Sequence, residues 1–147
     1  MLISQTAEYA IRAMSAIATL PEGIKIRAVD LGSAIGIPAP YLSKILRQLV
    51  LAGLLVSQKG QGGGFSLARP AAEIPFIDIL KAIDAYPTER SCAYGWGSCD
   101  RSSPCPLHRS WSRLNRQLRG WADEANLAEV ASAAEADPRF QLFPEAG

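Results

Sequence analysis

The chain has 147 residues, 48% of them hydrophobic and 20% charged, with a formal net charge of +1 at pH 7. This composition excludes a disordered chain and is typical of a globular protein. The first 70 residues hold seven basic and three acidic side chains (7 − 3 = +4), and the rest hold eight and eleven (8 − 11 = −3). A basic front half suits a phosphate-binding surface.

The first predicted element is an amphipathic helix that ends before the turn at Pro21. Its apolar residues recur at spacings of three and four: Ile3, Ala7, Ala10, Ile11, Met14, Ile17 and Ala18. The opposite face carries Gln5, Glu8, Arg12 and Ser15. Because charges interrupt the apolar stretch and no basic run precedes it, we interpret it as a helix of a cytoplasmic protein, not an export signal or membrane span.

A helix-turn-helix is predicted next. A short helix over 27–34 is followed by a turn at Gly36, and a third helix begins near Pro38 and ends before Gly53. The third helix should bury Leu42, Ile45, Leu46 and Leu49 and expose Tyr41, Ser43, Lys44, Arg47 and Gln48. The second helix of such a motif normally enters the major groove of DNA. From the helices alone, the exposed set fits base and phosphate contacts and a merely solvated face equally well.

A hairpin follows and favours DNA binding. Residues 54–58 and 65–68 alternate between apolar and polar, as half-buried strands do. The segment between them is rich in glycine and lacks the Gly-Lys-Ser/Thr of a nucleotide-binding phosphate loop. We therefore predict a wing that contacts DNA beside the third helix. The wing residues expected at the DNA are Lys59, Gln61, Gly62 and Gly63.

The second half begins with a fourth helix over 76–83, ended by Pro87, and a long helix starts near Pro104 and Pro106. Large apolar residues of the long helix repeat at spacings of four and three: Leu107, Trp111, Leu114, Leu118 and Trp121. So narrow a seam indicates pairing with a second copy, although folding back onto its own domain would also bury it. Four arginines flank the seam: Arg109, Arg113, Arg116 and Arg119.

Three cysteines lie between these helices, in the pattern Cys92-x6-Cys99-x5-Cys105-x2-His108. An odd number of clustered cysteines points to metal or redox chemistry, not to a framework of disulfides. Three thiolates with a histidine suit an iron–sulfur cluster. Zinc is also compatible with three cysteines and one histidine, although the short Cys-x2–4-Cys spacing usual for zinc is missing. Three unliganded thiols remain the third alternative.

In this order, the motifs resemble the IscR/NsrR/RirA-like family of winged-helix transcriptional regulators, which also includes CymR. The resemblance covers nearly the whole chain. It rests on the segments 6–12 (TAEYAIR), 41–46 (YLSKIL) and 60–70 (GQGGGFSLARP) and on three cysteines ahead of a long helix.

The resemblance implies a transcription factor, usually a repressor, whose cluster controls operator binding. Members with three cysteines hold a two-iron or four-iron cluster and respond to iron–sulfur supply, iron, nitric oxide or redox stress. The implied ligands are Cys92, Cys99 and Cys105, with His108 as the favoured fourth ligand and Glu8 of a partner subunit as the alternative. Glu8 could instead pair with Arg12 one turn along. The first cysteine spacing is one residue longer than in IscR, and Pro40 and Ser43 replace residues of its recognition helix, so its operator is not carried over.

We therefore expect a mainly α fold with a small β-hairpin wing and a long C-terminal dimerisation helix. The expected divisions are a winged helix-turn-helix domain over 1–86, a sensor loop over 87–108, the dimerisation helix with its following segment over 104–134, and a tail over 135–147. The expected partners are an operator in double-stranded DNA and a second copy of the chain. A cluster-free thiol redox sensor on the same fold, and a protein-interaction module that regulates an enzyme, are the alternatives. An enzyme is not expected, because the single histidine has no evident catalytic partners.

Overall fold

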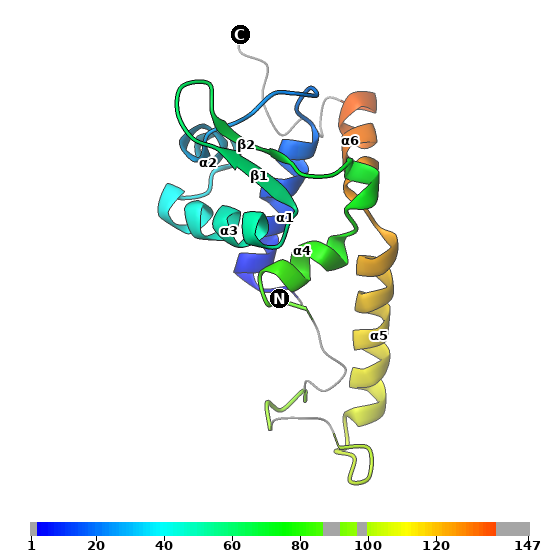
Figure 1. Ribbon diagram of the computed structural model, residues 1–147. Helices are drawn as coiled ribbons and strands as arrows, with labels where there is room; N and C mark the ends of the chain where they lie inside the picture. The colour runs from blue at the N-terminus through cyan, green and yellow to red at the C-terminus, as the bar shows by residue number, and fades with distance from the viewer. Residues whose placement is uncertain (1–2, 87–91, 97–99, 138–147) are drawn as a thin grey trace.

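The structure is a computed structural model that describes residues 3–86, 92–96 and 100–137. Three helices come first: α1 (Gln5–Ala18), α2 (Ala28–Ile35) and α3 (Ala39–Leu51). The hairpin strands are β1 (Leu55–Gln58) and β2 (Gly64–Leu67), and a short 3-10 turn, η1 (Ala71–Glu73), precedes α4 (Phe76–Ala82). The chain then forms α5 (His108–Glu124) and α6 (Leu127–Ala136). Figure 1 shows α5 extending away from the group made by α1–α4 and the hairpin.

Helix α1 lies at the centre of the fold. The Ser4 hydroxyl caps its start by accepting a hydrogen bond from the Ala7 N–H at 3.2 Å. The predicted apolar face is confirmed, with Ala7, Ala10 and Met14 fully buried. The placement of Ser15 on the outer face is wrong, since this residue is buried. The physical reason is that α1 is packed by α3 and α4 and also by α6, so more than one stripe of the helix is covered.

The helix-turn-helix is present. The turn between α2 and α3 passes through Gly36, whose φ of 69° is the left-handed conformation that glycine adopts without strain. A second glycine allows the close approach: a Cβ on Gly32 would lie 2.7 Å from the carbonyl oxygen of Ile37. Pro38 precedes the first residue of α3, and Gly53, with a φ of 76°, follows its end. These residues orient the two helices as the sequence predicted.

The hairpin is antiparallel, with Leu55 opposite Leu67 and Gln58 opposite Gly64. The predicted alternation of burial is wrong for β1: Leu55 is buried, whereas the next three residues are exposed. The reason is that only the base of the hairpin, beside α3, joins the hydrophobic core, so burial falls along the strand. Leu54, just before the strand, is buried as well.

The C-terminal part returns to the first helices. Trp121 of α5 stacks on Phe76 of α4 with ring centroids 5.4 Å apart. Asn126 then caps α6, forming a capping box with Glu129, and α6 packs against α1 and η1. The sequence pattern predicts one long helix with a following segment and does not distinguish α6 from it. Pro87, expected to end α4, lies outside the described residues, and the helix ends at Ala82. Within the described ranges, no helix has the length and apolar character needed to cross a bilayer.

Candidate nucleic-acid interface and cysteine loop

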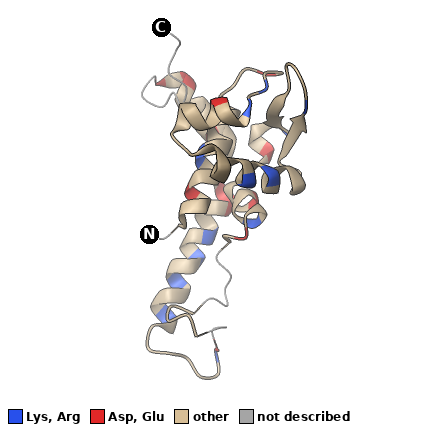
Figure 2. Cartoon of the chain, turned by 90° about the vertical axis from the view of Figure 1, so that its left-hand side faces the viewer, with Lys and Arg blue, Asp and Glu red and all other residues tan. Residues whose placement is uncertain are grey.

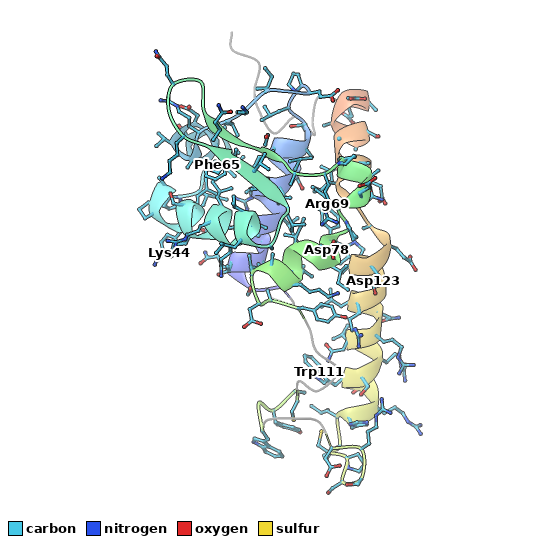
Figure 3. The ribbon with its side chains drawn as sticks, viewed as in Figure 1. Lys44, Phe65, Arg69, Asp78, Trp111 and Asp123 are labelled. Atoms are coloured by element: carbon cyan, nitrogen blue, oxygen red, sulfur yellow. The ribbon has the colours of Figure 1, made fainter. Side chains whose placement is uncertain are left out.

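Helix α3 is divided into a buried and an exposed face. Leu42, Leu46 and Leu49 are fully buried, and Ile45 is 4% exposed. All five residues predicted to face DNA are exposed: Tyr41, Ser43, Lys44, Arg47 and Gln48. Figure 3 shows Lys44 on the outer side of α3. The exposed face thus offers two cations, a phenol, a hydroxyl and an amide, which are groups that contact phosphates and base edges.

The wing lies beside α3. Lys59, Gln61 and Gly62 are exposed at its turn. Gly63 is buried, and the backbone approaches it so closely that a Cβ there would lie 2.2 Å from the carbonyl oxygen of Gln58. The turn therefore requires glycine at this position, whereas the sequence-based expectation placed Gly63 at the DNA.

The wing has a neighbour that sequence reasoning missed. Lys25 donates a side-chain hydrogen bond to Gln58 at the end of β1. Because Lys25 is exposed, it adds a basic residue beside the wing. Figure 2 marks basic residues on α3 and near the hairpin, and a separate series along α5. The only sequence signal for Lys25 was the basic balance of the front half.

The first helix holds Glu8 in an ion pair. Arg12 donates to the Glu8 carboxylate one turn away and, through its other terminal nitrogen, to the carbonyl oxygen of Ile35 at 3.4 Å. Its guanidinium also lies 5.8 Å from the ring centroid of Tyr9. The alternative that Glu8 pairs with Arg12 is therefore realised in the structure. The same arginine contacts the C-terminal end of α2, just before the turn of the helix-turn-helix.

Two of the three cysteines are described, and they lie together. Cys92 and Cys105 are free thiols, each partly buried. The backbone N–H groups of Tyr94 and Trp96 donate to the Cys92 sulfur and, with the Cys105 thiol, lower the pKa of Cys92 below its usual value. The N–H of Gly95, whose φ is 70°, closes the turn onto the Cys92 carbonyl oxygen at 3.0 Å. Cys99 lies outside the described residues.

His108 stands one turn beyond Cys105. Its backbone N–H donates to the Cys105 carbonyl oxygen at 3.0 Å, and it is the first residue of α5. Among the residues that the structure describes, no group of three or more His, Cys, Asp or Glu is arranged to hold a metal ion. The donor set nevertheless fits a metal cluster, because two thiols are in contact, that of Cys92 has a lowered pKa, and an imidazole follows at the start of α5.

The apolar seam of α5 is only partly covered by packing within the chain. The α5 residues buried in the chain are Asn115 and Ala122, which lie off the seam. Leu107 and Trp121 of the seam are each 42% exposed, and Trp111, Leu114 and Leu118 are partly buried. Packing within the chain, which includes the stacking of Trp121 on Phe76 of α4, therefore still leaves apolar area on the seam accessible.

The chain is similar to known proteins over most of its length. The sequence model of the Rrf2 family, described as an iron-dependent transcriptional regulator, matches residues 3–133. The chain is 38% identical over 135 residues to a Mycobacterium tuberculosis (strain H37Rv) protein named as an HTH-type transcriptional regulator, Rv1287, covering 91% of this chain and 83% of the relative. It is 28% identical over 135 residues to the HTH-type transcriptional regulator IscR of Escherichia coli (strain HS), covering 92% of this chain and 83% of IscR.

The fold matches a solved structure. The structure of CymR, titled the global cysteine regulator of B. subtilis, superposes with a TM-score of 0.74 at 20% identity, covering 89% of this chain and 96% of that one. The winged-helix arrangement of α1–α4 and the hairpin is therefore a known fold.

Proposed function

The chain belongs to the Rrf2 family of transcriptional regulators, and we propose that it is a homodimeric repressor whose operator binding is controlled by an iron–sulfur cluster in the cysteine loop. Membership confirms three predictions from the sequence: the family resemblance, the winged-helix fold and the absence of an enzymatic role. Repression, dimerisation, the cluster and the residues that perform each task are proposals.

The observation that carries the DNA-binding proposal is the division of α3. Four apolar side chains fix the helix to the core, and the residues between them are exposed beside the wing. In this proposal α3 lies in the major groove, where Lys44 and Arg47 contact phosphates or guanine edges. Lys59 and Gln61 of the wing contact the neighbouring backbone or minor groove. Gly63 is not included, because it is buried.

Dimerisation is proposed through the seam of α5. An operator-binding helix-turn-helix needs two copies about one DNA turn apart, roughly 34–36 Å. The seam supplies accessible apolar side chains on a helix that extends beyond the winged part of the chain. Two copies of α5 packed along this seam would set the distance between the two α3 helices.

The sensor is proposed at Cys92, Cys99 and Cys105. When bound, an iron–sulfur cluster supplies a centre that exchanges electrons and iron with its surroundings. Cys92 follows α4, and Cys105 directly precedes α5. Thiolates that bind one cluster would hold these two helices at a fixed separation. That separation would in turn influence the spacing of the recognition helices. His108 is the favoured fourth ligand, since Glu8 is already paired with Arg12.

One experiment tests both parts. The protein is purified anaerobically, its iron, sulfide and visible absorption are measured, and its binding to duplexes recovered by a genomic pull-down is titrated at several salt concentrations. We expect iron and sulfide in comparable amounts, and an affinity that falls steeply with salt. Protein without iron or visible absorption would refute the cluster, and binding to partner proteins without salt-dependent binding to DNA would refute the operator.

A thiol switch is the second candidate, favoured by the contact between the Cys92 and Cys105 thiols. Oxidation would join the two sulfurs, and the two protons and two electrons would reduce one hydrogen peroxide to two waters. Peroxide-dependent DNA binding that persists in metal-free protein and disappears in Cys92→Ser would select this candidate.

A further inference from the structure

Tyr86 holds the start of the cysteine loop. It lies six residues before Cys92 and packs, partly buried, against the hydrophobic core. Its hydroxyl oxygen accepts a hydrogen bond of 2.6 Å from Nε of Arg119 in α5. The Arg119 guanidinium carbon also lies 5.4 Å from the centroid of the Tyr86 ring. One residue of α5 therefore contacts both the hydroxyl and the ring.

The same ring contacts α4. The ammonium of Lys81 lies 5.3 Å from the ring centroid, within the range of a cation–π interaction. Tyr86 consequently joins two helices, one on each side of the cysteine loop in sequence. Both partners are cations, so they would repel each other if the electron-rich ring and hydroxyl oxygen were removed.

The backbone before Tyr86 is fixed by the end of α4. Asp84 adopts a left-handed φ of 55°, the N–H of Ala85 donates to the Leu80 carbonyl at 2.8 Å, and that of Asp84 donates to the Lys81 carbonyl at 3.2 Å. This pair of hydrogen bonds is a Schellman motif, which ends the helix with a defined exit direction. Tyr86 therefore lies two residues beyond a fixed point.

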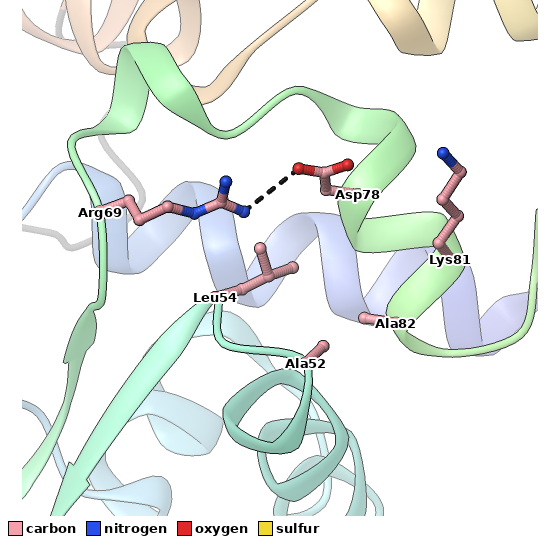
Figure 4. Close-up of a pocket in the computed structure, with 6 residues that line it drawn as sticks. All are labelled: Ala52, Leu54, Arg69, Asp78, Lys81 and Ala82. Atoms are coloured by element: carbon pink, nitrogen blue, oxygen red, sulfur yellow. Dashed lines mark hydrogen bonds and ion pairs between the residues drawn. The ribbon is translucent and has the colours of Figure 1, made fainter.

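Helix α4 is also tied to the wing. Arg69, two residues after β2, forms an ion pair of 3.2 Å with Asp78 of α4. Asp78 and Lys81 are three residues apart and line, with Arg69, Ala52 and Leu54, a cavity of about 320 Å³ (Figure 4). One short helix thus contacts the hairpin through Asp78 and the start of the cysteine loop through Lys81.

From this arrangement we infer that Tyr86 is a positioning residue that transmits the state of the cysteine loop to the DNA-binding domain. The inference rests on the proposed function. The loop begins at Tyr86, so a change in the position of Cys92 acts on the contacts with Arg119 and Lys81. Those contacts, together with the stacking of Trp121 on Phe76, determine how α5 lies on α4, and α4 is joined to the end of the hairpin through Arg69.

The test measures coupling, not binding alone. Operator affinity is determined anaerobically for cluster-loaded and cluster-free protein. The ratio of the larger to the smaller dissociation constant is then compared between variants. Tyr86→Phe keeps the ring on Lys81 and removes the acceptor of Arg119. We expect this variant to bind normal amounts of iron and sulfide and to lower the ratio about 3- to 10-fold toward one, within the usual range of allosteric coupling.

Arg119 provides the matched variants. Arg119→Met removes the hydrogen bond from the other side and should lower the ratio similarly, whereas Arg119→Lys keeps a donor and should restore part of it. The double variant should lower the ratio no further than Arg119→Met alone, because that variant already removes the hydrogen bond and the ring contact of Arg119 with Tyr86. Arg113→Met, which makes the same replacement at an exposed position of α5, is the control and should leave the ratio unchanged.

The outcomes separate the two proposals. A wild-type ratio of one would refute control by the cluster and, with it, the role of Tyr86. A wild-type ratio well above one that persists in both Tyr86→Phe and Arg119→Met would overturn the role of Tyr86 alone. If Tyr86→Phe loses its circular dichroism signal, the Arg119 pair decides the question.

Discussion

Ile26 and Phe65 exchange two backbone hydrogen bonds, of 3.1 and 2.8 Å, so the segment before α2 pairs with the edge of the wing through an isolated β-bridge. Gly64 permits this pairing, because a Cβ there would lie 2.6 Å from the Ile26 carbonyl oxygen and its φ is +143°. The wing is therefore attached to the helix-turn-helix through its backbone as well as through the core.

Gly64→Ala should consequently break this attachment. The added methyl group meets backbone atoms that cannot move away without losing the two hydrogen bonds, so we expect unfolding to become easier by roughly 2 kcal/mol or more. Urea titration measures the change. Gly60→Ala is the control, because its φ of +93° is strained but no atom lies within 4 Å of the new Cβ. Equal losses for the two variants would contradict the close approach.

Lys44→Ala and Arg47→Ala should weaken operator binding. A residue that contacts a phosphate should lower affinity for all duplexes and reduce the salt slope by about one, whereas a residue that reads a guanine should cost roughly 1–3 kcal/mol on the operator alone. Fluorescence anisotropy at several salt concentrations distinguishes these cases. Arg113→Ala, which removes the same charge from an exposed position of α5, should have no comparable effect. Unchanged affinity in both α3 variants would remove α3 from the interface.

Asp84→Gly should stabilise the protein. Asp84 is the one non-glycine residue with a positive φ among the described residues, and it occupies the left-handed position at the end of α4 where glycine is preferred. Glycine adopts this φ without the steric strain that a side chain causes, so the free energy of unfolding should rise by roughly 0.5–1 kcal/mol. Chemical denaturation measures it. The matched variant Gly36→Ala places a side chain at the corresponding position after α2 and should destabilise by a similar amount. A destabilised Asp84→Gly would show that the carboxylate stabilises the helix end.

These residues show how far the sequence alone leads. The buried and exposed faces of α3 follow from local periodicity, since leucines three and four apart must share one side of a helix. The pairing of Ile26 with Phe65, the burial of Gly63 and the burial of Ser15 depend on segments far apart in the chain, so local patterns do not encode them. The same holds for the packing of α6 on α1, because these two helices lie at opposite ends of the chain. The two cysteines that the structure describes were found from spacing, but the contact of Tyr86 with Arg119 spans 33 residues and had no sequence signal.

Leu114→Glu should separate the dimer. Leu114 lies on the seam, only partly buried within its own chain, and a carboxylate there would have to be buried without a partner between two copies of α5. We expect light scattering to report a monomer and the operator affinity to fall at least tenfold, because a single α3 contacts one half-site. Arg113→Glu alters the exposed neighbour and should leave the dimer intact. A dimeric Leu114→Glu would exclude the seam as the interface.

His108→Ala and Glu8→Ala should differ in their effect on the cluster. His108 begins α5 one turn after Cys105, whereas the Glu8 carboxylate is held by Arg12 on its own helix. Loss of an imidazole ligand should shift the visible absorption and lower iron retention about 10-fold or more, in the range seen when groups that support a metal are removed. Glu8→Ala should retain the wild-type spectrum and, because exposed ion pairs contribute little, change stability by less than about 1 kcal/mol. Anaerobic spectra and iron assays decide between the two ligands. A wild-type spectrum in His108→Ala, with loss of iron in Glu8→Ala, would reverse the assignment. The first helix of the partner subunit would then have to reach the loop.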